Sequence, residues 1–315
     1  MADKEMRAVY CDTLMKLAEN DPRICVVEAD LMKASGTMAF KAKYPDRGID
    51  VGVAEANLIG VSAGLSVAGK IPFAATFGCF ASRRCFDQFF LSANYARLNV
   101  KLTGTDPGIT AVFNGGTHMP FEDVGMMRLI PGLAITEPSD PASLEKLVIA
   151  CAGHYGCTYM RLHRKPVPSI YSSDEKFELG KGKVLRDGKD VAIIALGAVM
   201  VPEAILAARS LEKQGVSAAV IDILSVKPID VELVLGYAAK TGRIVTAENH
   251  QCACGLGGAV AELCSVERPT RIAMVGVHDE FGQVGTQNWL QDYYRLNAAE
   301  IEKQALRLMA GNGGK

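Results

Sequence analysis

Three short segments combine residues that can do chemistry with neighbours typical of active-site loops. The first begins at Glu55, and residues 56–69 after it carry no charge. An acid at a helix start often does no more than complement the helix dipole. In an apolar setting the same acid has a raised pKa and can exchange protons. Position alone leaves both interpretations open.

The second segment places Phe77 and Phe80 three residues apart, beside Gly78. Aromatic side chains at this spacing either cradle a flat ring or pack in the core. The third segment, 114–120, presents His118 after two glycines and before Met-Pro. This histidine is a candidate for acid–base or hydrogen-bond work, although a lone histidine is often an ordinary surface residue.

Metal and nucleotide motifs are absent or incomplete. Cys252 and Cys254 form C-x-C rather than the C-x-x-C pairs of zinc and redox sites. Residues 255–258 lack the G-x-G-x-x-G spacing, and the sequence contains no Walker motif. A G-x-S-x-G run at 60–64 lies inside the helix predicted over 55–68, and not at the strand-to-helix turn of a nucleophile elbow. No metal site is therefore predicted on this chain.

These segments must be positioned by strands that alternate with helices. The pattern predicts strands over 24–27, 73–77, 100–104, 158–162, 190–196, 218–224, 242–247 and 271–277, and helices over 4–19, 55–68, 83–97, 141–152, 202–214, 231–240 and 257–265. Such alternation predicts an α/β protein with two doubly wound, mostly parallel sheet domains. Ligands bind at the carboxyl ends of the strands in such sheets.

Residues 169–189 are polar, highly charged and glycine-bearing, which predicts a linker between domains at 1–168 and 190–315. The net charge of −1 excludes a strongly basic nucleic-acid footprint. The start lacks an apolar signal region, and the apolar stretches fall short of the ~18–20 residues of a membrane span. Nine cysteines, an odd number, do not suggest a secreted disulfide framework. We expect a soluble, cytoplasmic protein.

Four runs of sequence together resemble the C-terminal half of transketolase: VGVAEANLIGVSAGL, IPFAATFGCFASRRCFDQ, NGGTHMPFEDVGMMRLIPGLAITEPSDP and DILSVKPID. The resemblance covers nearly the whole chain. It implies the pyrimidine-binding domain of a thiamine-diphosphate enzyme over 1–168 and a transketolase C-terminal domain over 190–315. The implied activity is transfer of a two-carbon ketol unit from a ketose to an aldose, usually in the pentose phosphate reactions of carbohydrate metabolism.

The resemblance also implies roles for individual residues. Glu55 matches the family's catalytic glutamate, which hydrogen-bonds the cofactor's aminopyrimidine and favours the tautomer that deprotonates the thiazolium carbon. Phe77 and Phe80 match the aromatic pocket around the pyrimidine. Arg83 falls in the same cofactor pocket, where the family usually has a small or neutral residue. His118 matches a histidine that contacts a hydroxyl or carbonyl oxygen of the substrate.

Other positions match the end of the site that holds a sugar phosphate. Arg164, Ser35 and Arg7 match phosphate-holding residues, and a guanidinium suits phosphate because of its planar donor fork. Two substrate-binding positions depart from the family. Asp106 stands where a phosphate-facing histidine is usual, and Asn114 stands where an acid contacts the sugar hydroxyls.

The departures at Asp106 and Asn114 argue against a pentulose phosphate as the substrate. A carboxylate ~4 Å from an anion is repulsive by ~1–4 kcal/mol at surface-like dielectrics. We expect an unphosphorylated donor, or one whose anionic end is held by Arg83 or Arg84. In an alternative, the 105–110 loop has moved, so that Asp106 faces solvent and Arg164 alone holds a phosphate.

The sequence contains no Gly-Asp-Gly motif, which a full transketolase carries in a preceding domain that binds diphosphate and magnesium. The resemblance therefore implies a split enzyme. A separate subunit would hold the diphosphate and Mg²⁺, the thiamine diphosphate would lie between the subunits, and self-association would give a heterotetramer. A synthase of the deoxyxylulose-phosphate type, a 2-oxo-acid dehydrogenase beta subunit and a non-catalytic regulatory subunit are the alternatives.

Overall fold

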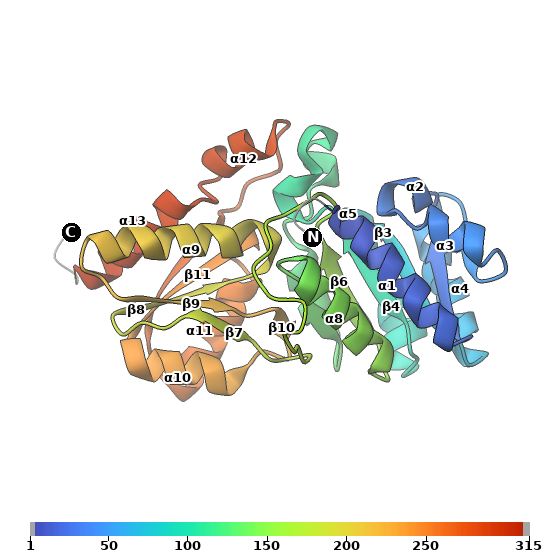
Figure 1. Cartoon of the computed structure of the whole chain (residues 1–315), viewed down its shortest axis with the longest axis horizontal. Coiled ribbons are helices and arrows are strands. Elements are labelled where there is room, and N and C mark those ends of the chain that lie inside the picture. The colour runs from blue at the N-terminus through green and yellow to red at the C-terminus, as the bar shows by residue number, and fades with distance from the viewer. Residues whose placement is uncertain (1–3, 311–315) are drawn as a thin grey trace.

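The computed structural model describes residues 4–310, which form two α/β domains (Figure 1). The first domain is built on a seven-stranded sheet with the order β10-β5-β6-β4-β3-β1-β2. Its strands are β1 (Ile24–Glu28), β2 (Gly48–Asp50), β3 (Ile71–Phe77), β4 (Lys101–Thr105), β5 (Ala134–Thr136), β6 (Thr158–Leu162) and β10 (Ser225–Lys227). All neighbours are parallel except β10, which is antiparallel to β5. The register places Phe77 opposite Thr105 and Thr105 opposite Leu162, so the carboxyl ends of β3, β4 and β6 meet at one edge.

The second domain has a five-stranded sheet with the order β12-β11-β8-β9-β7. Its strands are β7 (Lys183–Arg186), β8 (Val191–Ala195), β9 (Ala218–Asp222), β11 (Arg243–Gln251) and β12 (Arg271–Val277). Only β7 is antiparallel, to β9. Strands β8 and β9 are buried along their whole length, as strands covered on both faces must be. The predicted fold class is confirmed.

The helices of the first domain are α1 (Met6–Asn20), α2 (Met32–Ser35), α3 (Met38–Lys43), α4 (Glu55–Val67), α5 (Gly78–Arg83), α6 (Phe86–Gln88), α7 (Asp123–Arg128) and α8 (Pro141–Gly153). The second domain adds α9 (Gly197–Lys213), α10 (Val231–Thr241), α11 (Leu256–Glu267), α12 (Gln287–Tyr293) and α13 (Ala298–Met309). Helix α8 begins where the sequence predicts. Asp140 accepts a hydrogen bond from the Ser143 amide at 2.8 Å, and Pro141 occupies the first turn.

The single helix predicted over 83–97 is wrong. The helical segment begins at Gly78 and is divided into α5, α6 and a π-helical stretch, η1 (Phe89–Tyr95). The early start depends on Gly78, because a Cβ there would lie 2.9 Å from Pro120 Cγ. Two 3₁₀ segments, η2 (Gly108–Asn114) and η3 (Gly116–His118), form the loop that carries the predicted histidine.

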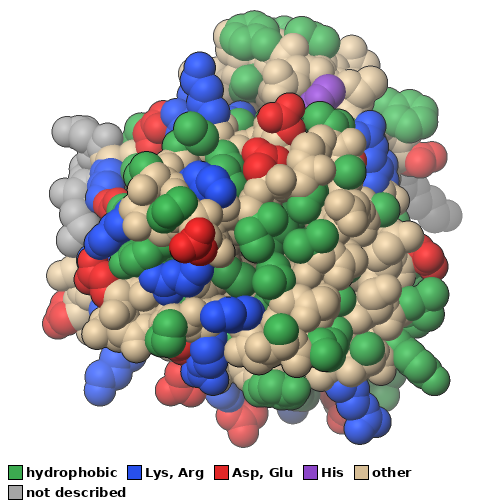
Figure 2. Space-filling model, turned by 90° about the vertical axis from the view of Figure 1, so that its right-hand side faces the viewer, with side chains coloured by type: hydrophobic (Ala, Val, Ile, Leu, Met, Phe, Trp, Pro, Cys, Tyr) green, Lys and Arg blue, Asp and Glu red, His purple; other side chains and the backbone are tan. Residues whose placement is uncertain are grey.

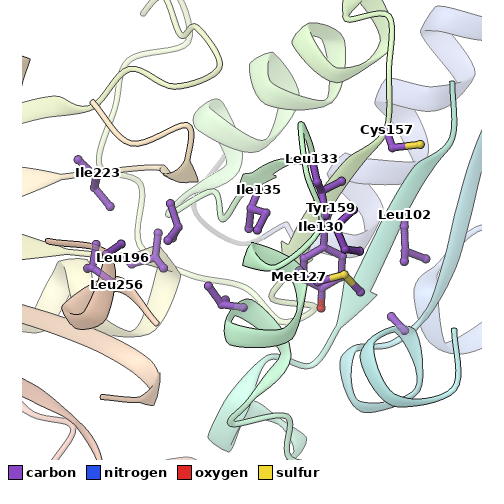
Figure 3. Packing of buried hydrophobic residues seen from close by; sticks show 14 of the residues in the cluster. Leu102, Met127, Ile130, Leu133, Ile135, Cys157, Tyr159, Leu196, Ile223 and Leu256 are labelled. Atoms are coloured by element: carbon purple, nitrogen blue, oxygen red, sulfur yellow. The ribbon is translucent and has the colours of Figure 1, made fainter. Parts of the chain in front are cut away.

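One hydrophobic core runs through both domains. Figure 3 shows Ile135 and Leu133 of the first domain on one side of this core and Leu196, Ile223 and Leu256 of the second on the other. Strand β10 reinforces the connection, since it follows β9 in the chain but pairs with β5 of the first sheet. The segment 169–189, predicted as a linker, contains β7 of the second sheet. The domain boundaries themselves stay a prediction.

Figure 2 looks onto the end of the first domain, where α2, α3 and α4 lie in Figure 1, and shows hydrophobic side chains through the middle of the face with charged ones around them. On α4, a Cβ added at Gly60 or Gly64 would meet no atom of the described chain within 4 Å. No other segment of residues 4–310 therefore packs closely against these two glycines. No helix in that range combines the length and apolarity needed to cross a membrane.

Candidate active site

The predicted site residues lie around the carboxyl edge of the first sheet. Phe77 ends β3, Asp106 follows β4 and Arg164 follows β6, while Glu55 begins α4. This clustering follows from the parallel strand order, which brings the ends of β3, β4 and β6 together. Residues more than a hundred positions apart in the sequence thus share one edge.

Phe77, Phe80 and His118 form an aromatic cluster. The ring centroids of Phe77 and Phe80 are 6.1 Å apart, and His118 lies 5.9 Å from Phe77 and 5.3 Å from Phe80. His118 meets both phenyl rings edge-on, at interplanar angles of 74° and 67°. Two of the segments singled out in the sequence therefore meet in space.

The two glycines before His118 are required by the loop geometry. Gly115 has φ +76°, a conformation that favours glycine. A Cβ on Gly116 would lie 2.2 Å from the carbonyl oxygen of Gly282, so the second domain touches this loop directly. Thr117 Oγ1 lies 2.9 Å from His118 Nδ1 and orients the half-buried ring.

Glu55 is 5% exposed at the first turn of α4 and accepts a hydrogen bond from Arg84 at 2.9 Å. The Arg84 guanidinium also lies over the Phe80 ring, 4.1 Å from its centroid. The sequence offered Arg84 as a grip for a substrate anion. In the structure, Arg84 instead connects the acidic residue to the aromatic cluster.

Asp106 and Arg164 form an ion pair at the carboxyl edge. Arg164 Nε lies 2.6 Å from Asp106 Oδ2, and both side chains are largely buried. Burial raises the pKa of the Asp106 carboxyl, and the Arg164 guanidinium opposes that rise. The Arg164 guanidinium also lies 5.3 Å from the Phe77 ring centroid. The alternative in which Asp106 faces solvent is wrong, because the 105–110 loop folds back onto Arg164.

Ser35 is buried, and its hydroxyl donates to Glu28 at 2.9 Å and to the Leu31 carbonyl at 2.6 Å. The nearby Ala34 carbonyl accepts hydrogen bonds from Arg7 at 3.0 Å and from Arg164 at 3.1 Å. The three residues predicted to hold a phosphate are therefore close together, but each already has a protein partner.

Sequence reasoning missed Glu28, a buried acid that lies directly behind Ser35. It ends β1, is fully buried and accepts hydrogen bonds from Ser35 and Thr37. Burial raises its pKa to about 8, and the two hydroxyl donors oppose the rise. The sequence does carry a signal for this residue, because Glu28 is an acid at the carboxyl end of an otherwise apolar strand.

Replacing Glu28 by glutamine is expected to flatten the pH dependence of stability. The raised pKa means that the folded chain keeps a proton that the unfolded chain releases above its usual value of 4.5. The resulting stability is complete below pH 4.5 and is lost as the pH rises towards 8. Glu28→Gln removes this contribution. Between pH 4.5 and 8, the free energy of unfolding of the variant should therefore fall with pH less steeply than that of the wild type, and the two slopes should differ by about 1.4 kcal/mol per pH unit. Denaturant unfolding over this range measures the slope. The surface variant Glu19→Gln is the control, and an equal slope in both variants would contradict the assignment.

Arg83 and Asn114 do not join the cluster. Arg83 pairs with Glu122 at 2.5 Å and donates to the carbonyls of Thr117 and Met119 at 3.3 and 3.5 Å, so it braces the histidine loop. Asn114 ends η2 and is exposed. The structure therefore brings Glu55, Phe77, Phe80, His118, Asp106 and Arg164 to one edge and leaves these two at its rim.

Comparison with known proteins gives this site a family. Residues 2–169 match the family model described as Transketolase, pyrimidine binding domain, and residues 180–301 match Transketolase, C-terminal domain. The chain belongs to the transketolase family. The 6-deoxy-6-sulfo-D-fructose transketolase subunit SqwH of Clostridium sp. (strain MSTE9) is 50% identical over 300 residues, which are 95% of this chain and 93% of that protein.

A solved structure described as a split gene transketolase, inactive beta4 tetramer, superposes with a TM-score of 0.91. It is 42% identical and covers 97% of this chain and 98% of that one. A 1-deoxy-D-xylulose-5-phosphate synthase of Heliobacterium modesticaldum is 35% identical over 303 residues, covering 95% of this chain and 46% of that protein. The transketolase subunits are thus the more similar relatives, and the protein is a thiamine-diphosphate-dependent transketolase subunit, a transferase.

The transketolase site fits the pyrimidine end of the cofactor. Thiamine diphosphate supplies the carbanion chemistry that breaks and forms the carbon–carbon bond of ketoses. The side chains that would hold a pyrimidine ring there are the two phenyl rings of Phe77 and Phe80 and the carboxyl group of Glu55 at a buried helix start.

Proposed function

We propose that this chain forms the pyrimidine-binding half of a two-subunit transketolase. The partner is a separate chain that holds the diphosphate and Mg²⁺, with the thiamine diphosphate between the subunits. Two relatives support this assignment: one is named a transketolase subunit, and the other is a split-gene transketolase whose beta4 form is inactive. Self-association into a heterotetramer and a cytoplasmic location remain part of the proposal, and the free thiols of all nine cysteines are consistent with a reducing compartment.

In this proposal Glu55 is the acid–base residue, and Phe77 and Phe80 hold the pyrimidine. His118 contacts an oxygen of the sugar at the reacting end. Asp106, Arg164 and Ser35 face the distal end of the sugar. Arg83 and Asn114 act from the rim, Arg83 by fixing the loop that carries His118.

The buried Asp106–Arg164 ion pair carries the assignment of the donor. Arg164 is the cation that would hold a phosphate, and Asp106 already neutralises it at 2.6 Å. A phosphate monoester carries about −1.5 to −2 charges at neutral pH, whereas a sulfonate carries one and an unmodified hydroxymethyl none. We infer that the donor is a ketose whose distal end is uncharged or singly charged, such as a sulfonated ketose. The 50% identical relative is named for 6-deoxy-6-sulfo-D-fructose.

The test is a competition assay on the complex reconstituted with its partner. Fructose 6-phosphate, 6-deoxy-6-sulfofructose and fructose are offered pairwise with one aldehyde acceptor, and the products are counted. The proposal expects the sulfonated or the neutral donor to have the higher kcat/KM. Preference for the phosphorylated donor would overturn the donor assignment, and lack of ketol transfer from every donor would overturn the function.

Replacing Asp106 by histidine is expected to shift donor choice towards phosphorylated ketoses. The substitution removes the carboxylate that neutralises Arg164 and adds a donor that can become cationic. The ratio of kcat/KM values, phosphorylated over unphosphorylated, should rise roughly tenfold, which corresponds to about 1.4 kcal/mol. The competition assay with matched donors measures this ratio.

Asp106→Asn is the matched variant, because it frees Arg164 without adding a cation. It should move the ratio in the same direction by less. An unchanged ratio in both variants would show that Asp106 does not act on the donor, and the charge argument would be withdrawn.

A further inference from the structure

The loop over residues 106–121 carries both Asp106 and His118, yet its two ends are held by the second domain. Near the first end, the Asn249 side chain donates from Nδ2 to the Pro107 carbonyl at 2.8 Å and accepts at Oδ1 from the Ile109 amide at 3.0 Å. At the other end, the Gln251 amide donates to the Phe121 carbonyl at 3.0 Å. Both holding residues lie on β11.

The Asn249 contacts fix an unusual backbone conformation. Asp106 has φ +56° and Gly108 has φ +52°, so two residues close together lie in the left-handed region. A Cβ on Gly108 would lie 2.1 Å from Asn249 Oδ1, which shows how closely the side chain fills the bend. Strained backbone of this kind persists only where its surroundings determine it. Asn249 donates one hydrogen bond to this bend and accepts another from it.

The backbone of Asn249 is held by a buried network of charged side chains. Its carbonyl accepts a hydrogen bond from Arg161 at 3.0 Å, and Arg161 is paired with Asp123 at 2.8 Å and Glu137 at 2.6 Å. All four residues are buried. Because the backbone carbonyl of Asn249 is bonded to a guanidinium that two buried carboxylates hold, β11 presents the side-chain amide to the loop from a fixed backbone position.

We propose that Asn249 is a positioning residue through which the C-terminal domain sets donor specificity. It holds residues 107–109 in the bend that keeps Asp106 on Arg164, and so it fixes the net charge at the distal end of the donor site. This inference rests on the proposed role of the Asp106–Arg164 pair. Without the amide, the Pro107 carbonyl and the Ile109 amide lose their partners, the bend relaxes, and Asp106 leaves Arg164.

The experiment uses the reconstituted complex with Asn249→Ala and Asn249→Asp. Asn249→Asp is nearly isosteric and keeps the acceptor for Ile109, but it sets a carboxylate against the Pro107 carbonyl. Val245→Ala is the matched control, because Val245 is a buried residue of the same strand that packs in the core of the second domain. Like Asn249→Ala, it shortens a buried side chain on β11 and so lowers stability, but it removes no hydrogen bond to the loop. If Asn249→Ala does not fold, Asn249→Asp decides.

We expect the ratio of kcat/KM for the neutral donor to kcat/KM for the phosphorylated donor to fall at least about fivefold in the Asn249 variants. The KM for the preferred donor should rise about fivefold, and kcat should stay within about twofold of the wild-type value. Val245→Ala should leave the preference unchanged. An unchanged preference and KM in both Asn249 variants would overturn the proposal, as would an equal shift in Val245→Ala. If the wild type itself prefers phosphorylated donors, the donor assignment fails alone, and the KM-against-kcat split then decides whether Asn249 positions the loop.

Discussion

Replacing Glu55 by glutamine is expected to lower the turnover of the reconstituted enzyme at least about 100-fold, the scale of a lost acid–base group. Glutamine has nearly the same shape and its side-chain oxygen can still accept the hydrogen bond from Arg84, so the helix start keeps its packing. It cannot, however, exchange a proton with the pyrimidine nitrogen. The ion pair that is lost involves an Arg84 side chain that is 52% exposed, so its contribution to stability is small.

The measurement is a steady-state assay with circular dichroism and thermal unfolding on the same preparation. Glu145→Gln is the matched control, because Glu145 is also a helical acid paired with a cation, Lys16 at 2.9 Å, but lies in α8 away from the site. The control should keep wild-type activity. A Glu55→Gln enzyme with more than about a tenth of the wild-type rate would remove Glu55 from its role and revive the non-catalytic alternative.

The chain on its own is expected neither to retain thiamine diphosphate tightly nor to turn over. In the proposed site this chain contributes the two phenyl rings and the Glu55 carboxyl group to the pyrimidine. Within residues 4–310, no three His, Cys, Asp or Glu side chains are grouped to hold a metal ion. Most of the affinity for a diphosphate comes from charge and metal contacts, which we assign to the partner.

Titration calorimetry tests this expectation with thiamine diphosphate, in the presence and absence of Mg²⁺, on the chain alone and on the reconstituted complex. The complex should bind in a magnesium-dependent manner and the chain alone should not. Micromolar, magnesium-dependent binding to the isolated chain would sink the two-subunit proposal. Activity in the absence of any partner would do the same.

The sequence predicted much of this fold because its signals are local. Apolar runs such as 191–195 and 218–222 became strands that are buried throughout, and Ser-Asp-Pro at 139–141 marked a helix start that the capping hydrogen bonds confirm. The start of this broken helix at Gly78 was missed, because Gly78 packs against Pro120, which lies more than forty residues away and which the local sequence does not reveal.

Most of the residues that the structure brings to the carboxyl edge were predicted from the sequence, but their pairings were not. Residue types and spacing made Glu55, the two phenylalanines and His118 candidates, and the resemblance to transketolase gave them roles. The fold brings the aromatic side chains together. The ion pairs of Glu55 with Arg84 and of Asp106 with Arg164 could not be read from the sequence. An ion pair depends on where strand ends meet, and a single sequence does not give the side-chain geometry there.

The left-handed backbone at residue 106 restricts how the donor site can evolve. Among residues with a side chain, aspartate, asparagine and histidine adopt that conformation most readily, and with φ +56° the position accepts them with little rearrangement of the loop. These three residue types carry a negative charge, no charge and a titratable positive charge. On the proposed role of Asp106, the change of a single codon at this bend would alter the charge that the enzyme accepts on its donor, while the surrounding fold and the reaction stay the same.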